Sequence, residues 1–190
     1  MSLTKYTTQN DLLLNNLMNY YKYNDNLNKM LKIITGESKI SLRIVDWFAT
    51  NYAKKNFTLY EIVDSFGITK RFKVYVDYKL KLKAYSKRRF DPFCRWDRIS
   101  IPYKDGNHIE TTIGQLNFFK WTLENNVIQY IEDNYDIIEK DMNNRNSTSK
   151  RKEIIFDNLN IKTRKKREEL SVSATKSIKK EKVEIVVNFN

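Results

Sequence analysis

The sequence has very few of the residues on which most metal and redox sites depend. It contains one cysteine (Cys94), one histidine (His108), four glycines and two prolines among 190 residues. A single cysteine excludes an intrachain disulfide and fits a reducing compartment. A structural zinc site needs about four Cys or His ligands, so this chain cannot build one alone. We therefore expect no bound metal and no cofactor.

The usual catalytic motifs are also missing. The glycines spell neither GxGxxG nor GxxxxGK[ST], and no GxSxG nucleophile elbow occurs. Cys94 and His108 could form a thiol–imidazole pair, although a buried cysteine and a turn histidine are the simpler interpretation. Four acids fall within twenty residues and could bind magnesium, although the simpler interpretation is that they balance basic neighbours and cap turns: Asp91, Asp97, Asp105 and Glu110. We predict no enzymatic activity, with a metal-dependent nuclease as an alternative.

Long apolar runs are absent as well. No stretch of about 18 apolar residues occurs, so we expect no membrane span. The first ten residues are polar, which predicts no signal peptide. The chain is 41% hydrophobic and 13% aromatic, which is enough for a packed core. We predict one globular domain over residues 1–143.

Apolar residues at three- and four-residue steps predict helices over residues 9–35, interrupted near residues 24–26 and ended by Gly36. Ser41 is a suitable N-cap for a third helix that runs to about Lys55. Thr112 and Gln115 match a capping box. This box predicts a C-terminal helical pair that runs to about residue 143 and is broken near residues 125–126.

Four segments are predicted to form a small antiparallel sheet: 57–63, 72–85, 98–103 and 107–111. Apolar residues alternate with mostly lysine residues from position 72 to 84, with Tyr75 as the exception. This alternation predicts a long strand with one buried face and one lysine-rich face. A helix is the alternative, because five large side chains could share one stripe: Phe72, Tyr75, Val76, Tyr78 and Leu82. The number of matches favours the strand. The predicted class is α+β.

The net charge of +12 is distributed in blocks. Residues 70–104 carry +9, residues 105–144 carry −6 and residues 145–182 carry +8. Separated blocks favour steering of an acidic partner more than solubility alone. From residue 144 to 182 the composition is polar and basic, which predicts a flexible extension. Residues 183–190 could form a short strand that docks on a sheet edge.

The basic blocks are the strongest functional signal. A strand over 72–85 would place alternate lysines on one face, about 6–7 Å apart. Aromatic residues interleave with the basic residues that follow, and this mixture is typical of surfaces that bind phosphates and stack on bases. A solvated outer face is the simpler alternative. The predicted nucleic-acid contacts are Lys73, Lys79, Lys81, Lys83, Lys87, Arg88, Arg89, Arg95 and Arg98, then Lys150, Arg151, Lys152, Arg164, Lys165, Lys166 and Arg167.

Three stretches resemble an uncharacterised protein family of the nucleocytoplasmic large DNA viruses. They are residues 41–55 (SLRIVDWFATNYAKK), 82–95 (LKAYSKRRFDPFCR) and 111–121 (TTIGQLNFFKW), and the resemblance covers roughly residues 40–143. No activity is assigned to that family, so the resemblance implies no catalytic residue. It implies a setting in which long DNA is bound or packaged: a viral factory in the host cytoplasm, or the virion. The basic runs could also serve as nuclear-import signals.

We predict a non-enzymatic basic protein that binds nucleic acid mainly through phosphate contacts, with little sequence preference. The alternative is a virion structural or assembly protein. Its basic blocks would contact acidic protein surfaces, or residues 105–144 of a neighbouring subunit by self-association.

Overall fold

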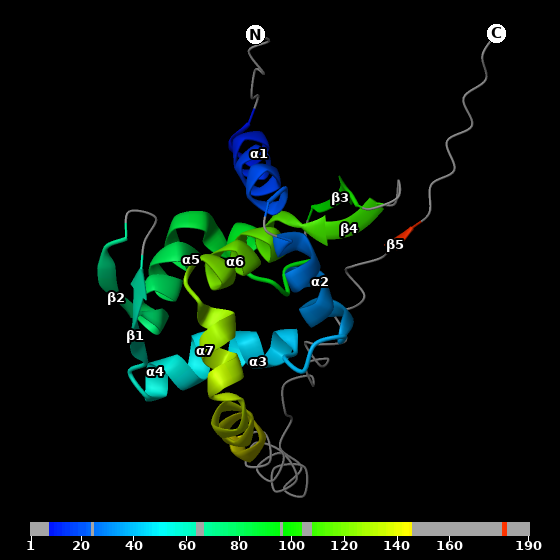
Figure 1. The fold of residues 1–190 in the computed structure, drawn as a ribbon. Coiled ribbons are helices and arrows are strands. Elements are labelled where there is room, and N and C mark those ends of the chain that lie inside the picture. The colour runs from blue at the N-terminus through cyan, green and yellow to red at the C-terminus, as the bar shows by residue number, and fades with distance from the viewer. Residues whose placement is uncertain are drawn as a thin grey trace, which may run out of the picture.

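The computed structural model of the protein describes residues 8–23, 25–63, 67–95, 97–103, 108–145 and 180–181. Figure 1 shows their arrangement of helices and short strands. The helical elements are α1 (Gln9–Tyr21), α2 (Asn26–Thr35), α3 (Leu42–Trp47), the π-helical segment η1 (Phe48–Tyr52), α4 (Ala53–Lys55), α5 (Val74–Phe90), α6 (Ile113–Glu124), α7 (Val127–Asp133) and residues 135–145. The strands are β1 (Leu59–Val63), β2 (Thr69–Lys73), β3 (Arg98–Pro102), β4 (His108–Thr112) and β5 (Lys180–Glu181). The mixture confirms the α+β class.

Helix boundaries follow local capping signals. The Ser41 hydroxyl accepts a hydrogen bond from the Ile44 amide (3.4 Å) at the start of α3. The Thr112 hydroxyl accepts one from the Gln115 amide (3.1 Å) at the start of α6. Gly36 ends α2 with φ at 80°, a conformation that glycine adopts without strain. The predicted starts and stops at these residues are confirmed.

The predicted strand over residues 72–85 is wrong. Strand β2 ends at Lys73, and Val74 begins helix α5. Val76 and Leu80, which the alternation assigned to a buried face, are 53% and 60% exposed. Val74 and Tyr78, which the alternation assigned to the same face and which lie one helical turn apart, are buried. Lysine, leucine, arginine and alanine are good helix formers, so local propensity agrees with the observed helix.

The strands form two separate sheets instead of the single sheet that was predicted. Strands β1 and β2 form an antiparallel hairpin in which Tyr60 lies opposite Phe72. Strands β3 and β4 form a second hairpin, and β5 extends it by pairing with the start of β4. This edge pairing involves residues 180–181, whereas the predicted docking strand over 183–190 lies outside the described residues.

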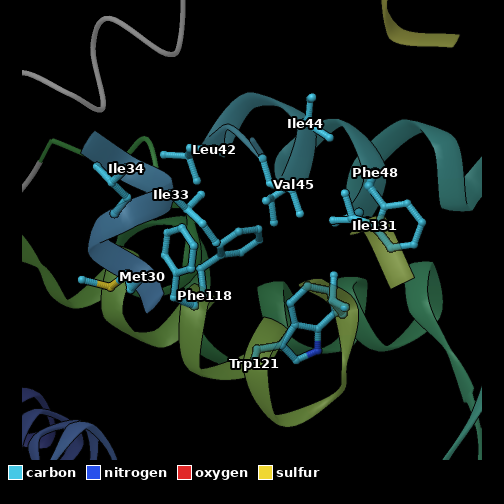
Figure 2. Packing of buried hydrophobic residues seen from close by; sticks show 14 of the residues in the cluster. Met30, Ile33, Ile34, Leu42, Ile44, Val45, Phe48, Phe118, Trp121 and Ile131 are labelled. Carbon is cyan, nitrogen blue, oxygen red and sulfur yellow. The ribbon is translucent and has the colours of Figure 1, made fainter. Parts of the chain in front are cut away.

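Helix α6 lies at the centre of the core. Every residue from Ile113 to Phe119 is buried, as expected for a helix that neighbours cover on all sides. Figure 2 shows Ile33 of α2 and Val45 of α3 pointing toward Phe118 of α6. The N-terminal helices therefore pack over one side of α6.

Helix α5 covers another side of α6 through an aromatic cluster. The Phe90 ring lies 5.9 Å from Tyr78, 5.9 Å from Phe118 and 5.8 Å from Trp121, between ring centroids. The Trp121 indole N–H also donates a hydrogen bond of 2.6 Å to the Asp77 carboxylate. These contacts fix the rotation of α5 about its axis and decide which of its side chains face outward.

Candidate nucleic-acid interface

The outer face of α5 combines lysines with apolar side chains. Lys79 and Lys83 lie one turn apart, and Val76 and Leu80 share their side of the helix. These four residues, with Tyr75 and Leu82, line a shallow surface hollow that belongs to α5 alone. Its lining is mostly apolar and includes the two lysines. Such a surface can contact a polyanion and an apolar group together.

Lys87 extends this positive charge past a break in the helix. Ser86 has φ at 65° and ψ at 164°, so the backbone kinks immediately before Lys87. Lys87 is exposed, like Lys79 and Lys83. Among the residues that the structure describes, no carboxylate forms an ion pair with any of these three lysines. As far as the described residues extend, their charges are therefore available to an external anion.

Strand β2 and helix α4 add cations at the N-terminal end of α5. The Phe72 side chain is buried, so strand alternation directs Arg71 and Lys73 outward, and both are exposed. The Lys54 ammonium lies 5.6 Å from the centre of the Tyr75 ring. Sequence reasoning named Lys73 but missed Lys54 and Arg71. Arg71 lay inside the basic block, so the block itself was the available signal.

Lys81 does not belong to this surface. Two residues along a helix differ by about 200° in direction, so Lys81 lies on the side of α5 away from Lys79 and Lys83. It is half-buried and lines a pocket with Leu13 of α1 and Glu124 of α6. The prediction that the odd-numbered lysines of residues 73–83 share one face is therefore wrong, because the segment is helical.

Two predicted contact residues already pair with acids. The Arg88 guanidinium lies 2.8 Å from the Asp97 carboxylate, and this hydrogen-bonded pair raises the pKa of Arg88. The Arg98 guanidinium lies 3.5 Å from the Glu110 carboxylate, across the β3–β4 hairpin. Both arginines remain partly exposed, but each carries less uncompensated charge than the lysines of α5.

The other predicted residues lie away from the hollow or outside the described part of the chain. Arg89 donates a hydrogen bond of 3.3 Å to the Gln9 side-chain oxygen, which ties α5 to α1. Arg95 is exposed in the loop after α5. The second predicted block lies outside the described residues: Lys150, Arg151, Lys152, Arg164, Lys165, Lys166 and Arg167.

The residues considered for catalysis do not gather into one site in the described part of the chain. There, no three His, Cys, Asp or Glu side chains lie close enough together to hold a metal. The Asp91 carboxylate accepts a hydrogen bond of 2.9 Å from the Phe93 amide. Cys94 and His108 are both half-buried, and no hydrogen bond joins them. Asp105 lies outside the described residues.

Acidic residues gather on other elements. Glu132, Asp133 and Asp136 are exposed on α7 and on residues 135–145. Asp141 faces α4, where its carboxylate accepts a hydrogen bond of 2.7 Å from the Lys55 ammonium, and this bond lowers its pKa. Helix α7 contacts both α6 and α3, and α5 contacts α6, so the two signs of charge lie on separate helices.

Comparison with known proteins gives a family but no activity. Residues 2–187 match the model of a family described as "Family of unknown function (DUF7197)". The chain is 48% identical over 129 residues to "Uncharacterized protein L507" of Acanthamoeba polyphaga mimivirus. This alignment covers 65% of the chain and 49% of that protein, so the chain spans about half the length of this relative. No solved structure shows significant similarity.

Membrane insertion through a helix has no candidate in the described part of the chain, because none of its helices has the required length and hydrophobicity.

The family match covers nearly all of the chain, and the relative is a giant-virus protein. Both agree with the resemblance that three sequence stretches indicated. The chain therefore belongs to DUF7197, an uncharacterised protein family with a giant-virus member.

Proposed function

We propose that this protein binds nucleic acid without catalysing a reaction, and that it does so in a viral factory or virion. The surface would comprise β2 and the outer face of α5. Its cations are Arg71, Lys73, Lys79, Lys83 and Lys87. Affinity would arise mainly from contacts between these cations and phosphates, so sequence preference would be weak.

The observation that carries this proposal is the set of lysines on α5 without acidic partners among the described residues. Like charges repel one another along a helix, so an uncompensated row of lysines costs stability unless a partner neutralises it. Val76 and Leu80 lie beside the lysines and are largely exposed, so their burial does not offset this repulsion. A bound polyanion would neutralise the ammonium groups and release counterions.

The test is the dependence of DNA affinity on salt, measured by fluorescence anisotropy with a labelled duplex. A plot of the logarithm of the wild-type association constant against the logarithm of the salt concentration should be linear. Its slope should be about −0.9 for each phosphate contact. Replacing Lys79, Lys83 and Lys87 together with Gln should reduce this slope by about 2 to 3. The same titration is run with the corresponding single strand, and a wild-type protein that binds neither form, or whose binding ignores salt, would refute the proposal.

A matched control changes the same amount of charge elsewhere. Lys22, Lys29 and Lys32 are exposed at the end of α1 and on α2. Their triple replacement with Gln lowers the net charge equally. If this control reduces the slope as much as the α5 variant, binding depends on overall charge and not on the α5 surface.

A second candidate function is assembly through self-association. The exposed acids Glu132, Asp133 and Asp136 could meet the lysines of α5 in a second copy, head to tail. Light scattering without nucleic acid separates the two candidates. Assembly requires a molecular mass that grows with concentration and falls with salt, whereas a monomer at all concentrations argues against it.

A further inference from the structure

Phe57 occupies a backbone position that normally favours glycine. It follows α4 with φ at 49°, in the left-handed region. The Thr58 amide donates a hydrogen bond of 3.1 Å back to the Ala53 carbonyl, which closes the turn that ends the helix. Helices that end in this way usually carry glycine or asparagine at the left-handed residue, because a larger side chain strains the backbone there.

Packing of the Phe57 side chain does not offset this backbone strain. It is 85% exposed, more than Tyr23 at 69%, and it takes no part in the hydrophobic core. The prediction that a strand covers residues 57–63 was therefore wrong for its first two residues, because Phe57 belongs to the turn and β1 begins at Leu59. A strained, exposed aromatic residue is better explained by a binding role than by folding.

The surroundings of Phe57 are cationic. Lys54 lies on the last turn of α4, with its ammonium over the Tyr75 ring at the start of α5. Lys73 lies opposite Leu59 in the β1–β2 hairpin, next to the turn. The Val74 amide donates a hydrogen bond of 3.3 Å to the Thr58 carbonyl, which joins this turn to the start of α5. Phe57 therefore stands where α4, β1 and α5 meet, at one end of the lysine surface.

We infer that Phe57 is a stacking platform for an unpaired base, and that this protein prefers single-stranded nucleic acid to duplex. This inference rests on the proposed function and names its ligand class. Lys54 and Lys73 would bind the phosphates on either side of that base. The lysines of α5 would bind phosphates further along the same nucleic-acid strand. Bases in a duplex already stack on their neighbours, whereas an unpaired base gains by stacking on an aromatic ring.

The experiment compares a labelled single strand of mixed sequence with the duplex of the same sequence, using the full chain. The key variant is Phe57→Gly, because glycine suits the left-handed backbone and should raise the unfolding midpoint. Lost binding would then not reflect misfolding. We expect Phe57→Gly to weaken single-strand binding by about 5- to 150-fold, the usual range for one lost stack, and to change duplex binding less than twofold.

Two further variants sharpen the result. Phe57→Trp keeps the aromatic surface, so it should retain single-strand affinity. Tyr23→Ala removes an exposed aromatic residue near α2 and should change neither affinity. Together these two variants test whether the loss of single-strand affinity is specific to the aromatic ring at position 57 or common to exposed aromatic residues.

The possible failures are distinct. If the wild-type protein binds neither form, the proposed function fails and the inference fails with it. If the wild-type protein binds both forms equally, or Phe57→Gly weakens both alike, the inference is overturned and the proposed function stands. If Phe57→Gly instead abolishes self-association in the absence of nucleic acid, Phe57 is an anchor for a protein contact and the inference is overturned.

Discussion

Replacement of Gly114 by alanine tests the packing of α5 on α6 through the sign of one free-energy change. Gly114 lies in the first turn of α6 and faces the last turn of α5. A Cβ atom at this position would stand 2.7 Å from the Asp91 carbonyl oxygen and 3.2 Å from the Arg88 carbonyl oxygen. Both neighbours are backbone atoms, so neither can rotate away as a flexible side chain would.

Two effects of opposite sign compete in this variant. Alanine is the better helix former by about 1 kcal/mol, which would stabilise the protein if the site had room. Relieving the contact requires the two helices to move apart, which typically costs about 1–3 kcal/mol. The movement also strains the 2.9 Å hydrogen bond that the Asn117 side-chain amide donates to the Arg89 carbonyl, worth about 1 kcal/mol. We expect Gly114→Ala to destabilise the fold by about 1–3 kcal/mol.

The assay is urea unfolding followed by tryptophan fluorescence, with the midpoint compared at an unchanged slope. Ala84→Gly is the control, because Ala84 is exposed on α5 and its loss measures the helix effect alone. This control should cost about 1 kcal/mol. If Gly114→Ala is as stable as the wild type, or more stable, the close approach of α5 and α6 is refuted.

Three further variants probe buried groups. Burial and the nearby Asp91 raise the pKa of Asp46 from 3.8 to about 7, so the folded state binds this proton more tightly than the unfolded chain. Stability should therefore fall as pH rises from about 4 to 7, and Asp46→Asn should flatten that fall in urea titrations, by roughly 1–4 kcal/mol at pH 8. Phe90→Ala removes a fully buried ring and should cost about 3–5 kcal/mol by the same assay, whereas a loss below 1 would contradict the aromatic cluster. Tyr21→Phe removes a 2.6 Å hydrogen bond to the Leu116 carbonyl and should cost about 1 kcal/mol in thermal unfolding; no change would mean that the bond adds nothing.

The proposed interface shows how a charge pattern differs from a binding surface. The sequence indicated where positive charge is dense, because that depends on composition alone. It could not show that Arg88 and Arg98 face Asp97 and Glu110, since these pairs form across a loop and a hairpin. Tertiary contacts therefore removed some predicted residues from the uncompensated set.

Phe57 shows a second limit of sequence reasoning. Its aromatic and β-branched neighbours favoured a strand, and nothing in the residue types indicates a left-handed backbone at a phenylalanine. The turn exists because α4 must end before β1 begins, so that the Tyr60 and Phe72 rings can pack against each other, 5.5 Å apart. The exposure of Phe57 follows from that arrangement.

The sequence by itself determined the ends of most helices, because caps such as Ser41 and Thr112 act within four residues through hydrogen bonds to nearby amides. It also determined the mixed class and the separation of charge along the chain. Only the tertiary structure decided the state of residues 74–85, because their alternation suits a strand and their residue types suit a helix. The helix is stabilised by the hydrogen bond between Trp121 and Asp77 and by the burial of Tyr78 against α6. That choice places Lys79 and Lys83 together and turns Lys81 away.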